Sequence, residues 1–396
     1  MARGRLRVAV VGGSLGGLTA ALVLRDAGCA VEVFERSASE LFGYGAGIVV
    51  HDATVRYFRE RTAVSLDELS VGVGSLRYLD REGSVVYEEP SSYRFTAWST
   101  LYRNLLRIFG EESYRRGEAL VGFEQDGQGV DVRFADGREE RYDLLVCADG
   151  VQSIGRRLLL RDVAPAYSGY VGWRGTVAET HLSPAAFAVL RNAITYAVLE
   201  RSHILAYPIP NVDGTLEPGS RLINFVWYRN VPAGSELDAL MTDRAGFPRL
   251  ISLPPGEVQA RYVHELHEAA AAALPPTLAE LVVTTERPFV QVVVDVEVPR
   301  MAVGRVCLIG DAAFVARPHA AAGTAKAAED AWKLAEAVGS SEGDIVPALR
   351  GWSERQVALG RRLVERTRAM GERSQRHGTW QPGDPELRFG LYGPGR

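Results

Sequence analysis

Three stretches of the chain place glycines and acidic side chains directly after short apolar runs, at residues 12–17, 149–150 and 310–311. In the first stretch, VVGGSLGGLTAALVL, the glycines follow a predicted strand and open a predicted helix. Gly12 allows a tight turn, and Gly17 allows the helix to pack close to the strand. Backbone N–H groups at the start of the helix attract a phosphate. This spacing is typical of a turn that binds the pyrophosphate of a dinucleotide.

Two further residues belong to this turn. Ser14 stands where the usual GxGxxG pattern has its middle glycine, and it is small enough for a phosphate to approach. Glu35 follows Gly12 by 23 positions, at the end of the second predicted strand, where its carboxylate can accept hydrogen bonds from ribose hydroxyls. A glycine-rich turn without a ligand is the alternative interpretation of this stretch alone.

The other two stretches favour the ligand. CADGVQS ends a predicted strand with Asp149 and Gly150, and LIGDAA does the same with Asp311. A third glycine-rich helix start follows near Gly323. Acids and glycines at several strand ends suit a long ligand that crosses the edge of a sheet. Taken singly, each acid is also explained as a turn or a helix cap.

The order of the predicted elements indicates an α/β fold with a second, sheet-containing domain. The elements are a βαβ unit at residues 5–36, a helix at 98–118, an antiparallel meander at 119–147, long strands at 170–177, 194–199, 203–210, 222–228 and 289–298, mainly helix at 235–285, a strand at 305–309, and helices at 324–338 and 346–376. The predicted boundaries are 1–165 and 299–377 for the nucleotide-binding part, 166–298 for the substrate domain and 378–396 for an irregular tail.

Composition excludes several other classes of protein. The 396 residues are 46% apolar and 24% charged, which is ordinary for a globular chain. The net charge of -4, without a basic block, argues against a nucleic-acid partner. No apolar run is long enough for a stable membrane association. Cys29, Cys147 and Cys307 are too far apart for a metal site, so we expect buried free thiols and a cytoplasmic location.

Three motifs resemble one known family. GGSLGG with Glu35 and Arg36, then CADGVQSIGR, then GDAAFVARPHAAAG resemble, in this order, the flavoprotein aromatic hydroxylases of the p-hydroxybenzoate hydroxylase type (class A). The motifs spread over residues 8–338, so the resemblance covers most of the chain. Four stretches, GYVGWRGTV, AYPIP, NFVWYRN and RPHAAAGTAKAAEDA, are most similar to members that hydroxylate dihydroxypyridines. The family implies a Rossmann-like FAD-binding domain, an interleaved β-sheet substrate domain and a C-terminal helical segment.

The resemblance also implies a cofactor, FAD, and an electron donor, NADH or NADPH. The residues that would hold the flavin lie at the motifs and in the loop that contains Gly45 and Ala46: Gly12, Gly13, Ser14, Leu15, Gly17, Glu35, Arg36, Gly47, Tyr102, Asp149, Gly150, Asp311, Gly323, Thr324 and Ala325. Two departures stand out. Tyr102 and Arg103 compete for the place of an arginine that many members use, and the segment at 318–323 lacks the usual Gln.

The implied reaction is hydroxylation of a small electron-rich ring, hydroxypyridine-like, with NAD(P)H and O₂ through a flavin hydroperoxide. A hydroxylated ring is more reactive after losing a proton, so a base near the substrate is useful. The candidates are His319, His203 and His51. As alternatives, His319 is a helix cap or another hydrogen-bonded structural residue, His203 is a solvated residue at the start of a strand, and His51 lies near the flavin. The candidates that line the substrate pocket are Trp173, Tyr207, Asn224 and Tyr228, although aromatic residues of a sheet are often core.

Other functions stay open at this stage. A reductase, a dehydrogenase or another tailoring oxidoreductase uses the same fold, and fold alone does not decide among them. A flavin halogenase is disfavoured because the chain has no WxWxIP segment. A flavin-binding regulatory protein is the non-catalytic alternative. The ring, the position that is hydroxylated, the choice between NADH and NADPH, and the oligomeric state, a homodimer among the alternatives, are not determined by the sequence.

Overall fold

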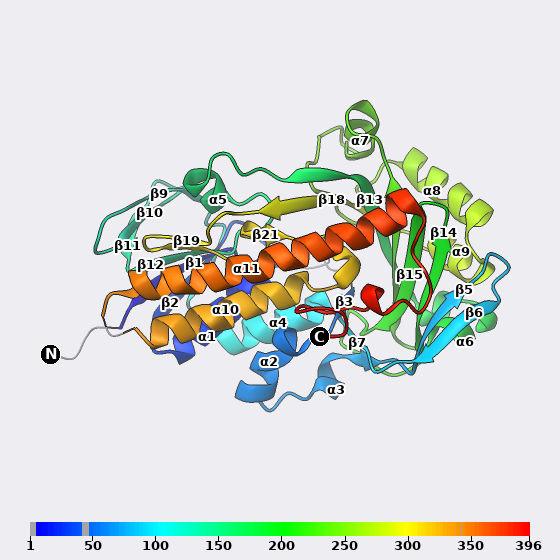
Figure 1. Ribbon diagram of the computed structural model, residues 1–396, viewed down its shortest axis with the longest axis horizontal. Helices are drawn as coiled ribbons and strands as arrows, with labels where there is room; N and C mark the ends of the chain where they lie inside the picture. The colour runs from blue at the N-terminus through cyan, green and yellow to red at the C-terminus, as the bar shows by residue number, and fades with distance from the viewer. Residues whose placement is uncertain (1–4, 42–46, 342) are drawn as a thin grey trace.

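Two large β-sheets organise the chain, whose computed structural model describes residues 5–41, 47–341 and 343–396 (Figure 1). The first sheet has the order β19-β20-β12-β1-β2-β8, and all its pairs are parallel except β19 with β20. Its strands are β1 (Arg7–Val11), β2 (Ala30–Glu35), β8 (Tyr114–Arg116), β12 (Leu144–Cys147), β19 (Ala302–Val303) and β20 (Val306–Leu308). The predicted Rossmann-like architecture is confirmed.

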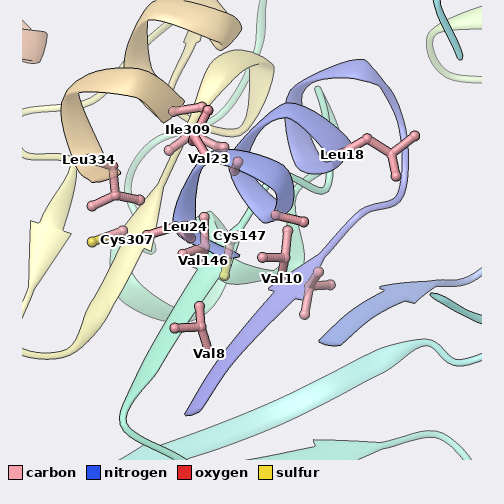
Figure 2. Packing of buried hydrophobic residues seen from close by; sticks show 14 of the residues in the cluster. Val8, Val10, Leu18, Val23, Leu24, Val146, Cys147, Cys307, Ile309 and Leu334 are labelled. Atoms are coloured by element: carbon pink, nitrogen blue, oxygen red, sulfur yellow. The ribbon is translucent and has the colours of Figure 1, made fainter. Parts of the chain in front are cut away.

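The centre of this sheet is buried on both faces. Val10 of β1 pairs with Val146 of β12, and Figure 2 shows these side chains close to Val8, Cys147 and Leu24. The strands are almost wholly apolar because other elements cover both faces: helices on one, and on the other the antiparallel meander at residues 120–142, whose Phe134 ring centroid lies 4.5 Å from that of Phe34 of β2. The covering helices are α1 (Leu15–Asp26), α10 (Gly323–Gly339) and α4 (Trp98–Phe109). All three cysteines are free and buried, as predicted.

The second sheet provides the platform for the substrate side. Its order is β17-β18-β13-β16-β15-β14-β5-β6, and β21 (Phe314–Val315) pairs with β18. Its strands are β5 (Ser75–Leu79), β6 (Val85–Pro90), β13 (Ala166–Ala178), β14 (Ala193–Leu199), β15 (Ser202–Ile209), β16 (Leu222–Asn230), β17 (Ser252–Leu253) and β18 (Phe289–Glu297). Strands β5 and β6 come from the segment before residue 165. The second sheet therefore contains strands from both sides of the predicted boundary at residue 165, and the domain boundaries stay a prediction.

Side chains alternate between the two faces of this sheet, as the geometry of a strand requires. Along β16, Phe225 and Trp227 lie in the cluster that also contains core residues of four helices, whereas Val226 and Tyr228 lie on the opposite face. The helices are α6 (Pro184–Leu190), α7 (Ser235–Leu240), α8 (Ala260–Ala273) and α9 (Pro276–Val283), and the last three lie at 235–285, where mainly helix is predicted.

One predicted helix is too long. The pattern at 98–118 predicts a single helix, but α4 ends at Phe109 because Gly110 takes a φ of 87°. The chain then enters β8, whose Tyr114 pairs with Val33 at the edge of the first sheet. The meander is confirmed, with β9 (Leu120–Gln125), β10 (Val130–Phe134) and β11 (Glu139–Tyr142).

Shorter elements connect the two sheets. A third small sheet joins β3 (Gly47–Val49), β4 (Val71–Gly72) and β7 (Arg94–Ala97). Helix α2 (Asp52–Arg61) follows strand β3, helix α3 (Leu66–Leu69) follows α2, and helix α5 (Ile154–Leu159) follows strand β12. None of the helices within the described ranges is long and apolar enough to cross a membrane.

The C-terminal helix α11 (Ile345–Glu372) runs alongside α10 from the first sheet towards the second (Figure 1). A π-helical turn, Arg373–His377, ends it. The tail beyond residue 378 is irregular, as predicted, apart from a short turn at Pro385–Leu387. It is nevertheless packed, because Trp380 and Phe389 are buried in the cluster that contains Tyr228.

Candidate active site

A cavity of about 460 Å³ lies between the two sheets, where the three glycine-containing motifs meet the second sheet. The motif residues that line it include Ser14, Leu15, Gly16, Gly47, Gly150, Val151, Gly310, Asp311, Gly323 and Thr324. The opposite wall comes from strands β13, β15, β16 and β18 and from the C-terminal tail. Segments from the two ends of the sequence, from Ser14 to Phe389, thus share one site, at the carboxyl ends of the parallel strands.

The first glycine turn has no room for side chains. Gly12 has a φ of 100°, and a Cβ there would lie 2.3 Å from the backbone oxygen of Ala148. A Cβ at Gly17 would lie 1.8 Å from the oxygen of Gly12. The N–H of Gly13 donates to Oε2 of the buried Glu35 at 2.9 Å. An ionised carboxylate has roughly four acceptor positions, so this bond leaves room for the predicted bond to a ribose.

Two helices point uncapped N-termini at the cavity. The N-cap residues, Ser14 of α1 and Ala322 of α10, make no side-chain capping bond, and the first residues of both helices line the cavity. N–H groups of a first helical turn need acceptors, and the helix dipole favours negative charge there. Together with the glycine turn, these two N-termini fit the pyrophosphate and the polar edge of FAD.

The two acids at the strand ends have different environments. Asp149 accepts bonds from the hydroxyl of Ser153 at 2.5 Å and the N–H of Ile154 at 2.7 Å, so it caps α5 and does not line the cavity. Asp311 is open to the cavity. The surrounding walls still desolvate its carboxyl and raise its pKa to about 6, against the opposing effect of Arg156. Asp311 is therefore the acid placed to bind a hydroxyl of the cofactor.

Two buried residues that sequence reasoning missed hold the motifs together. Arg156 donates to the carbonyl oxygens of Val151 and Ala312, and so joins the segment after β12 to the segment after β20. Asp330 of α10 accepts from the N–H of Gly310 at 3.0 Å. Arg156 stands within the motif CADGVQSIGR, but only the fold brings its partners 155 residues away into contact.

Tyr102, Arg36 and Ala325 are among the predicted cofactor residues that do not line the cavity. The hydroxyl of Tyr102 meets that of Tyr114 at 3.2 Å, and Tyr114 donates to the oxygen of Gly13 at 3.0 Å, so Tyr102 supports the glycine turn indirectly. Arg36 is exposed, and Ala325 is buried within α10. Arg103, the competitor of Tyr102, donates to the oxygen of Val212 at 2.7 Å. Gly45 and Ala46 lie outside the described residues.

Two of the three candidate histidines line the cavity. His319 and His203 are buried, with their ring centroids 5.4 Å apart. His51 does not line it, and its Nε2 bonds the carbonyl oxygen of Ala321 at 3.0 Å. That bond fixes the backbone of Ala321, which has a φ of 53° just before α10. His51 thus supports the loop rather than the reacting groups.

Both cavity histidines stay neutral at ordinary pH. Burial lowers the pKa of His203 to about 3, and its Nδ1 meets the hydroxyl of Ser374 at 2.5 Å. Burial also lowers the pKa of His319 well below its usual value, and His203 and Arg317 reinforce the effect. Nε2 of His319 lies 2.7 Å from the hydroxyl of Tyr170. Nδ1 of His319 has no hydrogen-bond partner within the part of the chain that the structure describes.

The four predicted pocket residues divide between two faces of the second sheet. Tyr207 and Tyr228 line the cavity, and Asn224 lies beside them, where its Oδ1 accepts from the N–H of Gly47 at 2.9 Å. The prediction for Trp173 is wrong, because Trp173 packs in the cluster on the opposite face. Its neighbour Arg174 lines the cavity instead, as the alternation along a strand requires.

The C-terminal tail supplies a wall that sequence reasoning missed. Trp380 and Phe389 line the cavity, and the indole of Trp380 stacks on the ring of His203 with centroids 4.4 Å apart. The indole N–H donates to the hydroxyl of Tyr78 at 3.3 Å. A ring-lined chamber suits a flat aromatic substrate. The sequence holds only a weak sign of this role, an aromatic pair in an otherwise Gly- and Pro-rich tail.

The fold and this cavity define an FAD-binding oxidoreductase, and comparisons with known proteins agree. Family models described as FAD binding domain and FAD binding domain-like match residues 5–198 and 167–295. The chain is 41% identical to 2,6-dihydroxypyridine 3-monooxygenase of Paenarthrobacter nicotinovorans, over 97% of this chain and 96% of that protein. It is 30% identical to a 3-amino-4-hydroxybenzoate 2-monooxygenase of Streptomyces platensis, over 93% of this chain and 88% of the relative.

A solved structure shows the same architecture. The structure of 2,6-dihydroxypyridine-3-hydroxylase from Arthrobacter nicotinovorans matches with a TM-score of 0.93 and 40% identity, over 98% of this chain and 97% of that one. The chain therefore belongs to the class A flavoprotein aromatic hydroxylases. It is an FAD-dependent monooxygenase, as the motifs predict.

Proposed function

We propose that this enzyme hydroxylates a small, electron-rich, hydroxylated N-heteroaromatic ring of the hydroxypyridine type, with NADH or NADPH as electron donor and O₂ as co-substrate. The observation that carries the proposal is the chamber formed by His319, His203, Tyr228 and Trp380 beside the FAD site. Its rings match the flat shape of such a substrate. The likeness to a 2,6-dihydroxypyridine 3-monooxygenase supports the same class.

Each wall of the cavity has its own task in this reaction. Bound FAD supplies the redox chemistry between NAD(P)H, O₂ and the ring. The glycine turn, the two helix N-termini and Asp311 hold the cofactor at one wall. The aromatic chamber orients the ring and keeps water away from it. Of the two cavity histidines, His319 has a ring nitrogen, Nδ1, without a partner in the described structure, so it is placed to act on a ring oxygen.

The test is a panel of hydroxypyridines, phenols and purines with the purified FAD-loaded enzyme. We expect a hydroxypyridine to stimulate NAD(P)H oxidation most, with consumption of O₂ and a product heavier by one oxygen atom. A phenol or a purine as the preferred substrate would reject the hydroxypyridine class. Stimulated oxidation of NAD(P)H that transfers no oxygen to any ring would favour the alternative, a reductase or dehydrogenase on the same fold. A homodimer and a cytoplasmic location stay predictions.

A further inference from the structure

His319 is anchored on one side and open on the other. Its Nε2 lies 2.7 Å from the hydroxyl of Tyr170, while its Nδ1 is buried, without a partner among the residues that the structure describes, in a side chain that lines the cavity. Buried polar atoms are nearly always hydrogen-bonded, so Nδ1 is the atom that meets a ligand. Whether Nδ1 accepts or donates there depends on which nitrogen carries the proton.

The direction of the bond at Nε2 follows from the residue beyond Tyr170. The Arg317 guanidinium is fixed by Asp295, to which its Nη2 donates at 2.9 Å and its Nε at 3.1 Å. From this position the charge of Arg317 acts on the hydroxyl of Tyr170 and lowers its pKa, against the larger effect of burial. A nearby cation favours the orientation in which the hydroxyl oxygen faces it and the hydroxyl hydrogen points away.

Among the described residues, the hydrogen-bond partner of the Tyr170 hydroxyl is Nε2 of His319. Tyr170 is buried, and if its hydroxyl only accepted a bond from His319, its own hydrogen would be buried without a partner. An unsatisfied buried donor is costly, so Tyr170 donates to Nε2. A neutral imidazole that accepts at Nε2 carries its proton at Nδ1.

We propose that Tyr170 and Arg317 are positioning residues that hold His319 as the neutral Nδ1–H tautomer, so that the site binds its ring as an oxyanion. On the proposed function, the hydroxylated ring releases its proton to bulk water, and Nδ1–H of His319 donates a hydrogen bond to the ring oxygen. His319 is then a donor that stabilises the reactive ionised ring. It does not take the proton itself, which revises the prediction of a base.

An independent feature of the cavity supports an anionic ligand. Arg174 lines the cavity, and no hydrogen bond or ion pair joins it to another residue in the described ranges. It is near enough to Tyr207 and Tyr228 to lower the pKa of both phenols, against the larger effect of burial. A cavity-lining cation without a described counter-charge complements an ionised ring.

The groups around His319 do not titrate in the working range of pH. Burial raises the pKa of Tyr170 and of Tyr228 well above the usual value. Burial lowers the pKa of His203 to about 3, and Arg317 keeps its charge because Asp295 holds it. A change in ring binding near neutral pH therefore reflects ionisation of the ring itself.

The first experiment determines the tautomer without a substrate. Two-bond ¹H–¹⁵N spectra of the FAD-loaded enzyme, with histidine ¹⁵N label and His319→Gln for assignment, report which nitrogen is protonated. We expect a proton on Nδ1 of His319 and no titration between about pH 6 and about pH 8.5. Tyr170→Phe should mix the tautomers, whereas Tyr167→Phe, which removes a hydroxyl of the same strand bonded to the Val231 oxygen, should not. An unprotonated Nδ1 in the wild type overturns the proposal.

The second experiment counts protons when a ring binds. Anaerobic calorimetry with 2,6-dihydroxypyridine, below the pKa of the free ring and in two buffers of different ionisation enthalpy, should show one proton released per ring bound. If no proton is released, either the ring binds in its neutral form or the protein keeps the proton, and both results overturn the proposal that the site binds the ring as an oxyanion. His319→Ala should weaken binding of the ionised ring by about 10- to 100-fold. If this ring does not bind at all, the proposed substrate class fails, and the tautomer measurement still decides the inference.

Discussion

The cofactor wall and the substrate wall of the cavity are specified by different kinds of residue. At the cofactor wall, the conformation of the backbone makes the site: Gly12 has a φ of 100° and stands against the backbone of Ala148. At the substrate wall, side chains make the site: His319, Tyr228 and Trp380 come from a loop, a strand and the tail. The residues that shape the cofactor wall are close together within each motif, whereas those of the substrate wall come together only when the chain folds.

This difference predicts how each wall responds to substitution. A glycine that must keep a positive φ against a backbone neighbour tolerates no side chain, and its loss removes the whole turn. An aromatic side chain in a chamber shares its contacts with several neighbours, so its replacement by a smaller ring changes affinity gradually. A single substitution at the cofactor wall should therefore abolish cofactor binding, whereas substitutions at the substrate wall should lower substrate affinity by degrees.

The largest effect is expected at the glycine turn. Gly12→Ala would place a Cβ 2.3 Å from the Ala148 oxygen, in a backbone conformation that costs an L-residue roughly 1–2 kcal/mol before any clash. We expect the purified variant to contain no FAD and to lose stability, as measured by flavin absorbance and thermal melting. Gly28→Ala is the control, because Gly28 has a similar φ of 93° with nothing within 4 Å of the added Cβ. Equal loss of FAD in both variants would contradict the close-approach argument.

The next effect separates the two strand-end acids. Asp311→Ala removes the carboxylate that opens to the cavity, so we expect FAD affinity to fall by about 10- to 100-fold while the fold persists. Asp149→Ala removes the cap of α5, so we expect a loss of about 0.5–2 kcal/mol in stability with little change in affinity. Dialysis and flavin titration measure the first quantity, and denaturant melts measure the second. The reverse pattern would reject the assignment of the two roles.

The pH dependence of FAD binding sharpens the same assignment. The pKa of Asp311 is raised to about 6 without cofactor, so the carboxyl gains a proton as pH falls through that value. A protonated carboxyl is a poorer acceptor for a hydroxyl, and FAD affinity of the wild type should therefore fall below about pH 6. The stability of the apoprotein has the opposite dependence on pH: the desolvating walls favour the neutral carboxyl in the folded state, so the contribution of Asp311 to stability is lost as pH rises through about 6. Asp311→Asn should flatten both profiles.

Most of the fold could be predicted because the strands carry their own patterns. The βαβ unit, the meander and the long strands of the second sheet lie where apolar runs and turn residues predict them. The helix at 98–118 failed because Gly110 ends it, and the pairing of β8 with β2 is a contact that local propensity cannot report. The place of β5 beside β14 is likewise a matter of tertiary pairing.

The candidate site divides in the same way. The glycine turn and Asp311 could be predicted, because they follow strands at a fixed spacing. Trp173 could not be placed, since a shift of one residue in register moves a side chain to the other face of a sheet. Arg156 and Trp380 act through partners more than 150 residues away, so no window of sequence contains the contact.

The smallest effect compares two tryptophans on opposite faces of the second sheet. Trp380 lines the cavity and stacks on His203, whereas Trp173 lies in the core on the far face. Trp380→Phe makes the aromatic surface beside the substrate smaller and removes the hydrogen bond from the indole to Tyr78. We therefore expect the KM for the substrate ring to rise by about 2- to 10-fold. Trp173→Phe should lower the melting temperature and leave the KM unchanged. Steady-state kinetics with the preferred ring, at saturating NAD(P)H, measure the first effect. A rise of KM in Trp173→Phe alone would mean that the sheet presents its other face to the substrate, and the assignment of the two walls would be wrong.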